Sequence, residues 1–526
     1  MGFPKFWGRP TAAASADPDS SSDLEVIHDG DLTYTVAKAH NGSGVTWQEA
    51  TGAPVESKSP LGYHVGWATV IFLNVNQMIG TGIFSTPGTI LGRTGSIGLA
   101  LIYWVIGIFL AIAGFAVYLE LASYFPNRSG SEVVYLEQAY PRPRHFFPIS
   151  FAFYSVVLSF SSSNAIVLSN YLWALAHKTP TDWEVKGIAI AAYSVAVICV
   201  IAHNKYSLWA MNVIGIVKIL TLIFISITGF VILGGHASRV ADPGANFRNA
   251  FEGTTNNGND LSMALVNIVF AYSGYANAFS VVNEIQNPIP TIKRNGAASI
   301  AVVATLYLLC NIAYFSAVPK AEFARSKATA ASDFFAAVFG EGRAQDALNA
   351  LVLISAFGNL LAVLIVVSLK TYPDGIFFVA MAIGLWIIRY RHKRLNRERP
   401  AFKAWDICLV FFLLVQIYTI ATPWIPPKGG PYAGEVSFWY ATYAVVGIGA
   451  IVLCAIYYII WMYLLPKLGG YQLRPEILNV GNQGANTHRL LKVPLDEVDK
   501  WDREHDEAGR LRRRNEYGAE IASLEK

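Results

Sequence analysis

Residues 76 to 88 read Asn76-Gln77-Met78-Ile79-Gly80-Thr81-Gly82-Ile83-Phe84-Ser85-Thr86-Pro87-Gly88, inside an apolar run near Val65 to Leu91. Two glycines flank a threonine there and a proline follows, which favours local unwinding of a helix. In lipid, unwinding frees backbone N–H and C=O groups where only a ligand, an ion or water can satisfy them. The stretch therefore predicts an interrupted membrane helix, although glycines also serve simply to permit close helix packing.

The composition of the whole chain also indicates a membrane protein. Of its 526 residues, 53% are apolar and only 14% are charged, against about 25% charged in an ordinary soluble domain. Runs this long without alternation are helices, and most are near the ~20 residues that cross a bilayer. We therefore expect an all-α integral membrane protein with eleven spans, near Val65 to Leu91, Ile97 to Leu119, Ile149 to Ala176, Gly187 to Ala202, Leu208 to Leu233, Leu261 to Val282, Ala297 to Val318, Ala347 to Leu369, Ile376 to Tyr390, Ile407 to Trp424 and Val436 to Leu465.

Other classes of protein fit the composition poorly. A net charge of +4 is too small to indicate a nucleic-acid partner. The four cysteines each lie in an apolar run, and no His/Cys cluster indicates a metal site. No nucleophile–base pair occurs inside the spans, so we predict neither an enzyme nor a cofactor.

A second span is interrupted in a similar way. It carries Phe270-Ala271-Tyr272-Ser273-Gly274-Tyr275-Ala276-Asn277, again a glycine with polar neighbours at mid-depth. Each break opens a five-helix half, and a matched pair of breaks favours a transporter binding site over mere packing. Half-helix N-termini attract a carboxylate and freed carbonyls accept from an ammonium, which together describe the main chain of a free amino acid.

One charged side chain, Lys218, lies deep inside a span. A charge there costs at least ~2.5–3.5 kcal/mol on insertion scales, so we expect it to face the protein interior. It would act as a fixed cation in place of a bound Na⁺ or as a proton carrier; snorkelling to the interface fits its central position less well. The third span offers Ser159, Ser161, Ser162, Ser163 and Asn164, for which lining a path and bonding across helices both stay open.

Several motifs together resemble one family. They are Ile79-Gly80-Thr81-Gly82-Ile83-Phe84, Tyr118-Leu119-Glu120-Leu121 with Phe125-Pro126 and Ser129-Gly130, Lys218, the sixth-span stretch running into Glu284, and Phe357-Gly358-Asn359. They resemble the L-type amino acid transporter branch of the amino acid–polyamine–organocation superfamily. Within that branch the chain looks most like the fungal high-affinity methionine permeases, over roughly Ser59 to Leu465.

The resemblance implies twelve helices in an inverted-repeat fold, with spans 1 and 6 broken around an amino acid, alternating access and proton coupling. Glu120 and Glu284 match family positions at cytoplasmic span ends, where we rank capping or loop anchoring ahead of a gating role. Carried over by position, the substrate-binding residues are Ile79, Gly80, Thr81, Gly82, Ile83, Phe270, Ala271, Tyr272, Ser273 and Gly274, and the coupling residue is Lys218.

The chain departs from the family after its eighth span. Only Lys370 to Gly375 stands where the family has a basic loop and a ninth helix, so we expect that helix to be missing. The predicted parts are a disordered cytoplasmic tail (1–60), a permease domain truncated near 369–375 (61–465) and a cytoplasmic C-terminal tail (466–526). The predicted function is proton-coupled import of methionine or another neutral amino acid across the plasma membrane. The alternative is a non-transporting nutrient sensor, or an inactive splice or gene-model variant that retains the binding site.

Overall fold

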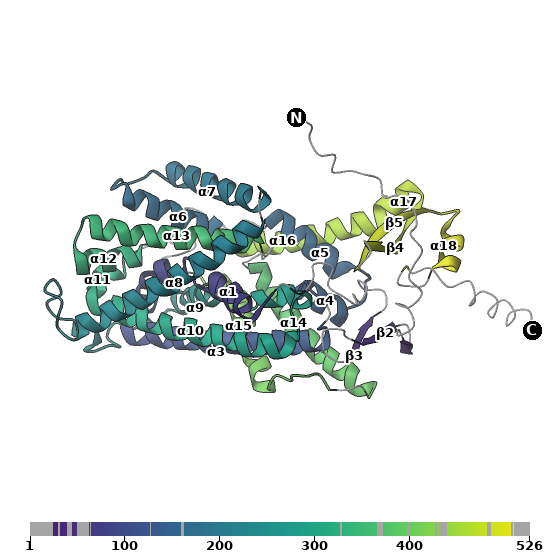
Figure 1. The fold of residues 1–526 in the computed structure, drawn as a ribbon, viewed down its shortest axis with the longest axis horizontal. Coiled ribbons are helices and arrows are strands. Elements are labelled where there is room, and N and C mark those ends of the chain that lie inside the picture. The colour runs from purple at the N-terminus through teal and green to yellow at the C-terminus, as the bar shows by residue number, and fades with distance from the viewer. Residues whose placement is uncertain are drawn as a thin grey trace, which may run out of the picture.

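A computed structural model describes residues 25–29, 32–38, 45–49, 63, 65–126, 128–158, 162–202, 204–326, 329–365, 372–396, 399–426, 430, 439–480, 485–505 and 509. Side chains are described for most of these residues beyond 62, apart from 152, 155–163, 200–209, 211, 361–373, 443 and 477–488. The chain is mostly helical, and its long helices form an elongated bundle with a small strand-containing part at one end (Figure 1).

Helices fill the region between residues 67 and 469. α3 is a continuous apolar helix that follows Gly95, whose left-handed backbone (φ +73°) ends α2. Pro288 starts α10 at a position where proline is well tolerated. The helices are α1 (Trp67–Met78), α2 (Gly82–Thr94), α3 (Ile97–Tyr124), α4 (Glu132–Ala139), α5 (Phe146–Leu158), α6 (Ser162–Leu175), α7 (Asp182–Ala202), α8 (Asn204–Leu233), η2 (Ala245–Phe247), α9 (Gly258–Tyr272), η3 (Asn277–Glu284), α10 (Pro288–Ala317), α11 (Lys320–Phe323), α12 (Ala330–Phe339), α13 (Arg343–Ile365), α14 (Tyr372–Arg394), α15 (Asp406–Ala421), η4 (Thr422–Trp424), α16 (Thr442–Ile459), η5 (Ile460–Leu464) and α17 (Leu465–Gly469).

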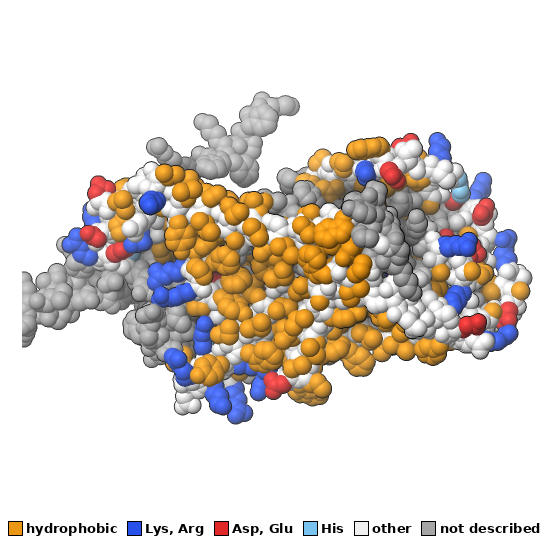
Figure 2. Space-filling model, turned by 180° about the vertical axis from the view of Figure 1, so that it is seen from behind, with side chains coloured by type: hydrophobic (Ala, Val, Ile, Leu, Met, Phe, Trp, Pro, Cys, Tyr) orange, Lys and Arg blue, Asp and Glu red, His pale blue; other side chains and the backbone are white. Residues whose placement is uncertain are grey.

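The surface of the bundle suits a membrane. Seven helices in the described part of the chain are long and apolar enough to cross one. The other four of the eleven predicted runs coincide with α1 and α2, with α5 and α6, with α7 and with α13. Apolar side chains cover the middle of the face in Figure 2, and charged side chains gather toward its two ends. An exposed apolar surface of this extent is typical of a lipid-facing protein.

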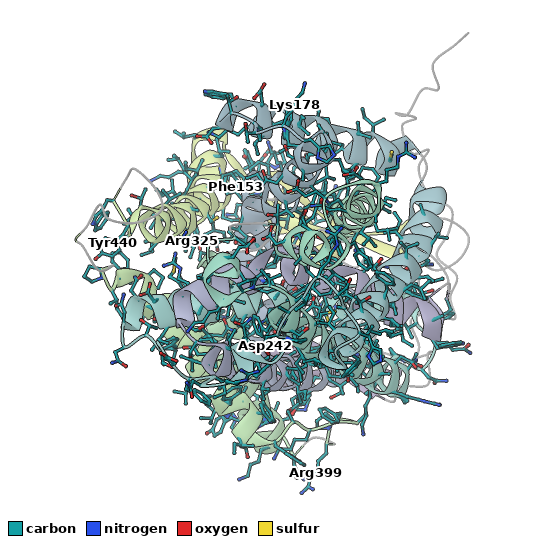
Figure 3. All side chains as sticks on the ribbon, turned by 90° about the vertical axis from the view of Figure 1, so that its left-hand side faces the viewer. Phe153, Lys178, Asp242, Arg325, Arg399 and Tyr440 are labelled. Atoms are coloured by element: carbon teal, nitrogen blue, oxygen red, sulfur yellow. The ribbon has the colours of Figure 1, made fainter. Side chains whose placement is uncertain are left out.

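The helices pack in two groups. α1 and α2 lie with α3, α9 and α10, while α13 packs against α6, α7 and α8. Viewed along the bundle, side chains fill the space between helices seen largely end-on (Figure 3). Phe153 of α5, labelled there, stacks on Tyr457 of α16 with ring centroids 4.3 Å apart. α8 belongs to both groups, since it packs against α10 at least as extensively as against α13 and also touches α1.

The helix ends define two faces of the domain. At the face where α3 ends, Glu120 binds Arg389, near the end of α14; we call this the Glu120 face. At the opposite face α3 begins, and Ser96 accepts a hydrogen bond of 2.8 Å from Thr254 in the loop before α9. α13 begins near this same loop, because Gly340 lies against Arg239.

α13 and α14, which lie in separate predicted spans, run in the same direction. α13 starts at the opposite face and reaches the centre of the domain at Asn359. α14 passes from Gly375, beside Ile420 at the far end of α15, to Arg389 at the Glu120 face. Only residues 366–371 separate α13 from α14, whereas helices joined by so short a connection are normally antiparallel.

Strands occur in both terminal segments. β1 (Glu25–Asp29), β2 (Leu32–Lys38) and β3 (Val45–Glu49) form an antiparallel sheet within the segment for which the sequence predicts disorder. β4 (Tyr471–Val480) and β5 (Ala485–Pro494) form a hairpin, and α18 (Val498–Glu504) follows it. Short runs rich in Val, Ile, Thr and Tyr favour strands, which accounts for the sheet.

Candidate functional site

The two helix breaks meet inside the bundle. α1 ends at Met78 and α2 begins at Gly82; α9 ends at Tyr272 and η3 begins at Asn277. A Cβ at Gly82 would lie 2.9 Å from the Cα of Ala271. A Cβ at Gly274, whose φ is +119°, would lie 2.5 Å from the Cγ of Gln77. Because any side chain at these two positions would push the breaks apart, glycine is what allows the two backbones to touch.

Side-chain donors from four elements cap the carbonyls at the end of α1. Near the end of a helix the last carbonyls have no i+4 donor, so Asn76 O and Gln77 O would otherwise be left unsatisfied in the interior. Leu73 O lies one turn earlier, within the hydrogen-bonded part of α1, and Met78 O also accepts a bond of 2.8 Å from the N–H of Gly80. The donors lie on η3, α8, α13 and α10. The bonds run from Asn277 to Leu73 O (3.1 Å), Lys218 to Asn76 O (3.0 Å), Asn359 to Asn76 O and Gln77 O (3.1 Å each) and Tyr307 to Met78 O (2.5 Å).

The first amides of α2 are donors that remain available. The N–H groups of Gly82 and Ile83 bond to no acceptor in the described part of the chain, whereas Phe84 and Ser85 bond to Thr81 O. Both residues are buried. The positive end of the α2 dipole lies at these same amides, so the break offers an anionic group two aligned donors.

Lys218 is buried completely, as its central place in α8 predicts. Its Nζ donates to Asn76 O, and one turn earlier Gly215 lies against the Asn76 side chain. No carboxylate pairs with Lys218 among the residues that the structure describes. Asn76 Oδ1 and Asn359 Oδ1 are buried without a partner, so the cluster around Lys218 holds spare acceptors.

Thr81 contacts a polar residue of the third predicted span. Its hydroxyl donates to Asn164 Oδ1 of α6 at 2.7 Å, and both side chains are buried. The contact joins the first break to the second helix group. The neighbouring Ser159, Ser161, Ser162 and Ser163 lie outside the residues whose side chains the structure describes.

The backbone of residues 270–274 lies at the second break, but the Tyr272 ring is used in packing. That ring lies between Trp104 of α3 and Tyr307 of α10, with centroids 5.9 and 5.2 Å away. Gly107 leaves room for it, since a Cβ there would meet the ring at 2.4 Å. Ser273 Oγ donates to Phe270 O at 2.7 Å and so caps the last turn of α9.

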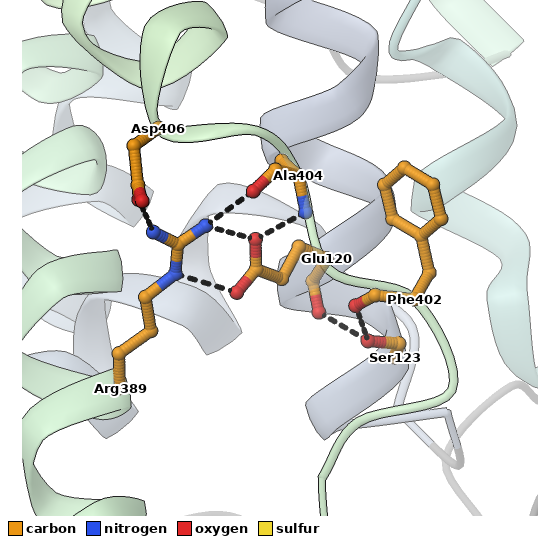
Figure 4. A network of polar contacts seen from close by, with 6 residues as sticks. All are labelled: Glu120, Ser123, Arg389, Phe402, Ala404 and Asp406. Atoms are coloured by element: carbon orange, nitrogen blue, oxygen red, sulfur yellow. Dashed lines mark hydrogen bonds and ion pairs between the residues drawn. The ribbon is translucent and has the colours of Figure 1, made fainter.

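Glu120 forms a closed polar network at one face of the domain (Figure 4). It is fully buried and binds Arg389 through two hydrogen bonds of 2.7 and 2.6 Å. The N–H of Ala404 donates to the same carboxylate at 2.7 Å, and Arg389 also binds Asp406. The network ties α3 to α14 and to the connection before α15, which is an anchoring arrangement.

Glu284 lies at the end of η3 and is half-buried. Its carbonyl accepts a bond of 3.3 Å from the N–H of Val65, just before α1. The two glutamates thus lie at helix ends, and the ten residues predicted to bind substrate lie at the two breaks. No group of three or more His, Cys, Asp or Glu able to hold a metal lies within the described residues.

Two of the carbonyl-capping residues, Tyr307 and Asn277, carry no local signal that marks a site. Tyr307 stands in an uninterrupted apolar span, and its bond to Met78 joins residues 229 positions apart. Asn277 closes the quoted second stretch, but its partner Leu73 lies 204 positions away. Sequence periodicity describes one element at a time, so such long-range partners escape it.

Known proteins similar in sequence to this chain include amino acid permeases and transporters. The sequence model of a family described as amino acid permease matches residues 65–369 and 361–451. The high-affinity methionine permease of Saccharomyces cerevisiae is 32% identical over 501 residues, covering 84% of this chain and 86% of the relative. The b(0,+)-type amino acid transporter 1 of Mus musculus is 30% identical over 272 residues, 51% and 54% of the two chains. Among solved structures, Mhp1, a nucleobase-cation-symport-1 family transporter in a closed conformation, gives a TM-score of 0.41 at 10% identity, covering 78% of this chain and 81% of that one.

Proposed function

The chain belongs to the amino acid permease family, and from this premise we propose that it imports a neutral amino acid, methionine first among them, across the plasma membrane. It is a multi-pass membrane protein, and its relatives are permeases and transporters rather than enzymes. The L-type resemblance read from the sequence is thereby confirmed. We further propose that import is coupled to a proton and proceeds by alternating access.

The observation that carries the proposal is the contact between the two breaks. Gly82 touches Ala271 and Gly274 touches Gln77, so free amides and helix-end carbonyls face one small region. The amides of Gly82 and Ile83 would bind the substrate carboxylate, as anions bind at helix N-termini. The carbonyl of Ala271, whose one bond in the described part of the chain comes from Tyr307, would accept from the substrate ammonium, because each carbonyl oxygen has two lone pairs. Met78 O already accepts from Gly80 N–H and Tyr307, so it would receive the ammonium in place of the Tyr307 hydroxyl.

Transport requires the two helix groups to move past each other. We propose that α1, α2, α3, α9 and α10 rock against α6, α7, α8 and α13, with the two broken helices related as inverted repeats. Among the described residues, the polar contacts that tie the groups at the site are those of Lys218 and Asn359 with the end of α1, of Asn164 with Thr81, and of Tyr171 with Phe84 O. Gain or loss of a proton at Lys218 would change the charge on one of these ties and so couple it to the motion.

The orientation follows from charge. α1 begins at the Glu120 face, because Val65 bonds to Glu284 and the next-door Asn283 bonds to Ser129, in the loop after α3. α16 returns to that face, where Tyr458 bonds to Arg144 O. The basic end of α14, with Arg389, Arg391, Lys393 and Arg394, lies there too. We therefore place the Glu120 face and both tails in the cytoplasm.

A second function, binding without transport, is favoured by one feature. α13 and α14 run in the same direction across a six-residue gap in the sequence, and the family match divides at residues 361–369. Both observations support the loss of the ninth helix, part of the scaffold against which the breaks would move. A chain without that helix would keep the groups that bind an amino acid and lose flux.

Three measurements test the proposal: transcript sequencing, methionine uptake and methionine binding. Sequencing the transcript across Leu369 to Gly375 decides whether the short junction is the natural one. The full chain is then produced in a host deficient in methionine uptake, and radiolabelled methionine is used for both uptake by cells and binding by purified protein. Uptake that a protonophore abolishes supports the transporter, and saturable binding without uptake supports the sensor. Absence of both binding and uptake would overturn both readings.

A matched pair of variants tests whether methionine binds at the two helix breaks. Gly80→Val places a Cβ 2.5 Å from Asn359 Nδ2 and should abolish binding. Gly187→Val, on α7, meets no atom within 4 Å and should leave binding unchanged. If the two variants, compared at equal protein amounts, bound methionine equally well, the helix breaks would not form the binding site.

A further inference from the structure

The Tyr307 hydroxyl lies between the two breaks. Its oxygen is 2.5 Å from Met78 O and 3.1 Å from Ala271 O, and the residue is completely buried in α10. Met78 ends α1, and Ala271 lies in the last turn of α9. Ala271 O therefore has no backbone donor in the described part of the chain, and Met78 O accepts one, the N–H of Gly80 at 2.8 Å, which leaves it one further lone pair.

Packing fixes the position of this hydroxyl. The Tyr307 ring meets Trp104 edge-on, with centroids 5.5 Å apart and planes at 87°, and it meets Tyr272 at 5.2 Å. α10 is a 30-residue helix, and Tyr307 stands in its interior rather than on a loop. A group held in this way keeps its place while the unwound segments around it adjust.

We propose that Tyr307 is a positioning residue of the amino acid site, which sets the spacing of the two helix-end carbonyls that receive the substrate ammonium. A hydroxyl has one proton to donate, so Tyr307 satisfies one of the two carbonyls at a time. The other carbonyl is left to accept from the ammonium, and the O–H turns toward whichever carbonyl the ammonium does not hold. The inference rests on the proposed function, because it needs an amino acid at the breaks.

The opposing explanation is that Tyr307 only fills space among aromatic rings. The same helix provides a control that separates the two roles. Tyr314 lies two turns further along α10, is also completely buried, and its hydroxyl has no hydrogen-bond partner in the described part of the chain. Tyr307→Phe and Tyr314→Phe therefore remove the same atom from the same helix, with and without a bond to the breaks.

The test measures equilibrium binding of two probes by the purified full chain: methionine, and 4-(methylthio)butanoate, which is methionine without its amino group. Tyr307→Phe should raise the Kd for methionine by about tenfold, since the two carbonyls lose the bond that sets their spacing, and a displacement of about 1 Å at a site can cost that much or more. The same change should alter the Kd for the butanoate by less than about twofold. Tyr314→Phe should change neither value.

Several results would overturn the inference. An unchanged methionine Kd in Tyr307→Phe would do so, and so would an equal rise for both probes, because a space-filling role does not distinguish them. If Tyr307→Phe does not fold, 3-fluorotyrosine at position 307 strengthens the donor with little change of shape; an unaltered ratio of the two Kd values would then count against the proposal. Absence of methionine binding to the wild-type chain would overturn the proposed function itself, and this inference with it.

Discussion

Replacement of Gly82 by alanine is the sharpest test of how closely the two helix breaks must approach. The added Cβ would lie 2.9 Å from Ala271 Cα and 3.2 Å from Ala271 Cβ. Carbon atoms in contact are about 3.5–4.0 Å apart, so the overlap with the backbone is about 0.6 to 1.1 Å. A backbone atom cannot rotate away as a side chain can, so α2 and the end of α9 must separate by nearly that distance.

The expected loss follows from this separation. Overpacking of a dense interior costs about 1–3 kcal/mol, and a misplacement of about 1 Å at a site can cost on the order of 100-fold. We therefore expect the methionine Kd of Gly82→Ala to rise by roughly 10- to 100-fold, measured by equilibrium binding to purified protein. Gly449→Ala, on α16, adds the same atom where nothing lies within 4 Å and should bind as the wild type does. A folded Gly82→Ala protein with wild-type affinity would refute the assignment of the site to the contact between the breaks.

Three further predictions concern charged groups. Lys218→Met removes the donor to Asn76 O, so the initial rate of methionine uptake should fall at least about tenfold. The remaining uptake should no longer depend on external pH between 5 and 7, and a wild-type pH profile would refute the coupling role. Glu120→Gln breaks a buried ion pair, which should lower the free energy of unfolding by about 3–5 kcal/mol with an unchanged methionine Kd, measured by thermal unfolding in detergent; altered flux at an unchanged Tm would point to gating instead. Arg474 of β4 donates hydrogen bonds to Asp502 of α18 and so lowers the pKa of that carboxyl. The stabilisation that these bonds give is present above the unfolded pKa of about 3.9 and is lost as the pH falls from there through the lower pKa of the folded state. Hydrogen exchange of β4 and β5 should accelerate over that range in the wild type but not in Asp502→Asn.

The sequence predicted the features that depend on local chemistry. The helices follow the apolar runs, and the first break falls at residues 79–81, which include Gly80 and directly precede Gly82, the two glycines that favour unwinding. Burial of Lys218 followed from the cost of a charge in lipid. The strands were also signalled, since Asp29-Gly30 and Gly481 to Gly484 are turn-forming residues between strand-like runs, but compositional reasoning about the tails passed over them.

The hydrogen-bond and packing partners that residues find on distant helices could not be predicted from the sequence. Tyr272 was assigned to the site by resemblance, but α9 continues through it, so its ring follows the helical phase of Ile268 toward Gly107. The resemblance places the backbone of residues 270–274, whereas the direction of each side chain depends on where the helix stops. Tyr307 was not predicted at all, because a tyrosine in an apolar span is ordinary until its neighbours are known.

The capping of α1 by distant residues has a consequence for synthesis in the membrane. The first span leaves the ribosome long before its donors: Lys218 comes 142 residues after Asn76, Tyr307 comes 229 after Met78 and Asn359 comes 283 after Asn76. At about 5–20 residues per second, the carbonyls at the end of α1 wait roughly 15 to 55 s for the last of them. During that interval the first span must keep its polar end in water, at the translocation machinery or against a temporary partner. In a chain in which the four natural cysteines are replaced and a single cysteine is introduced within residues 76–82, nascent chains stopped before and after residue 359 should therefore differ in how well this cysteine is shielded from a water-borne thiol reagent. The amino acid site would be among the last parts of the molecule to be completed.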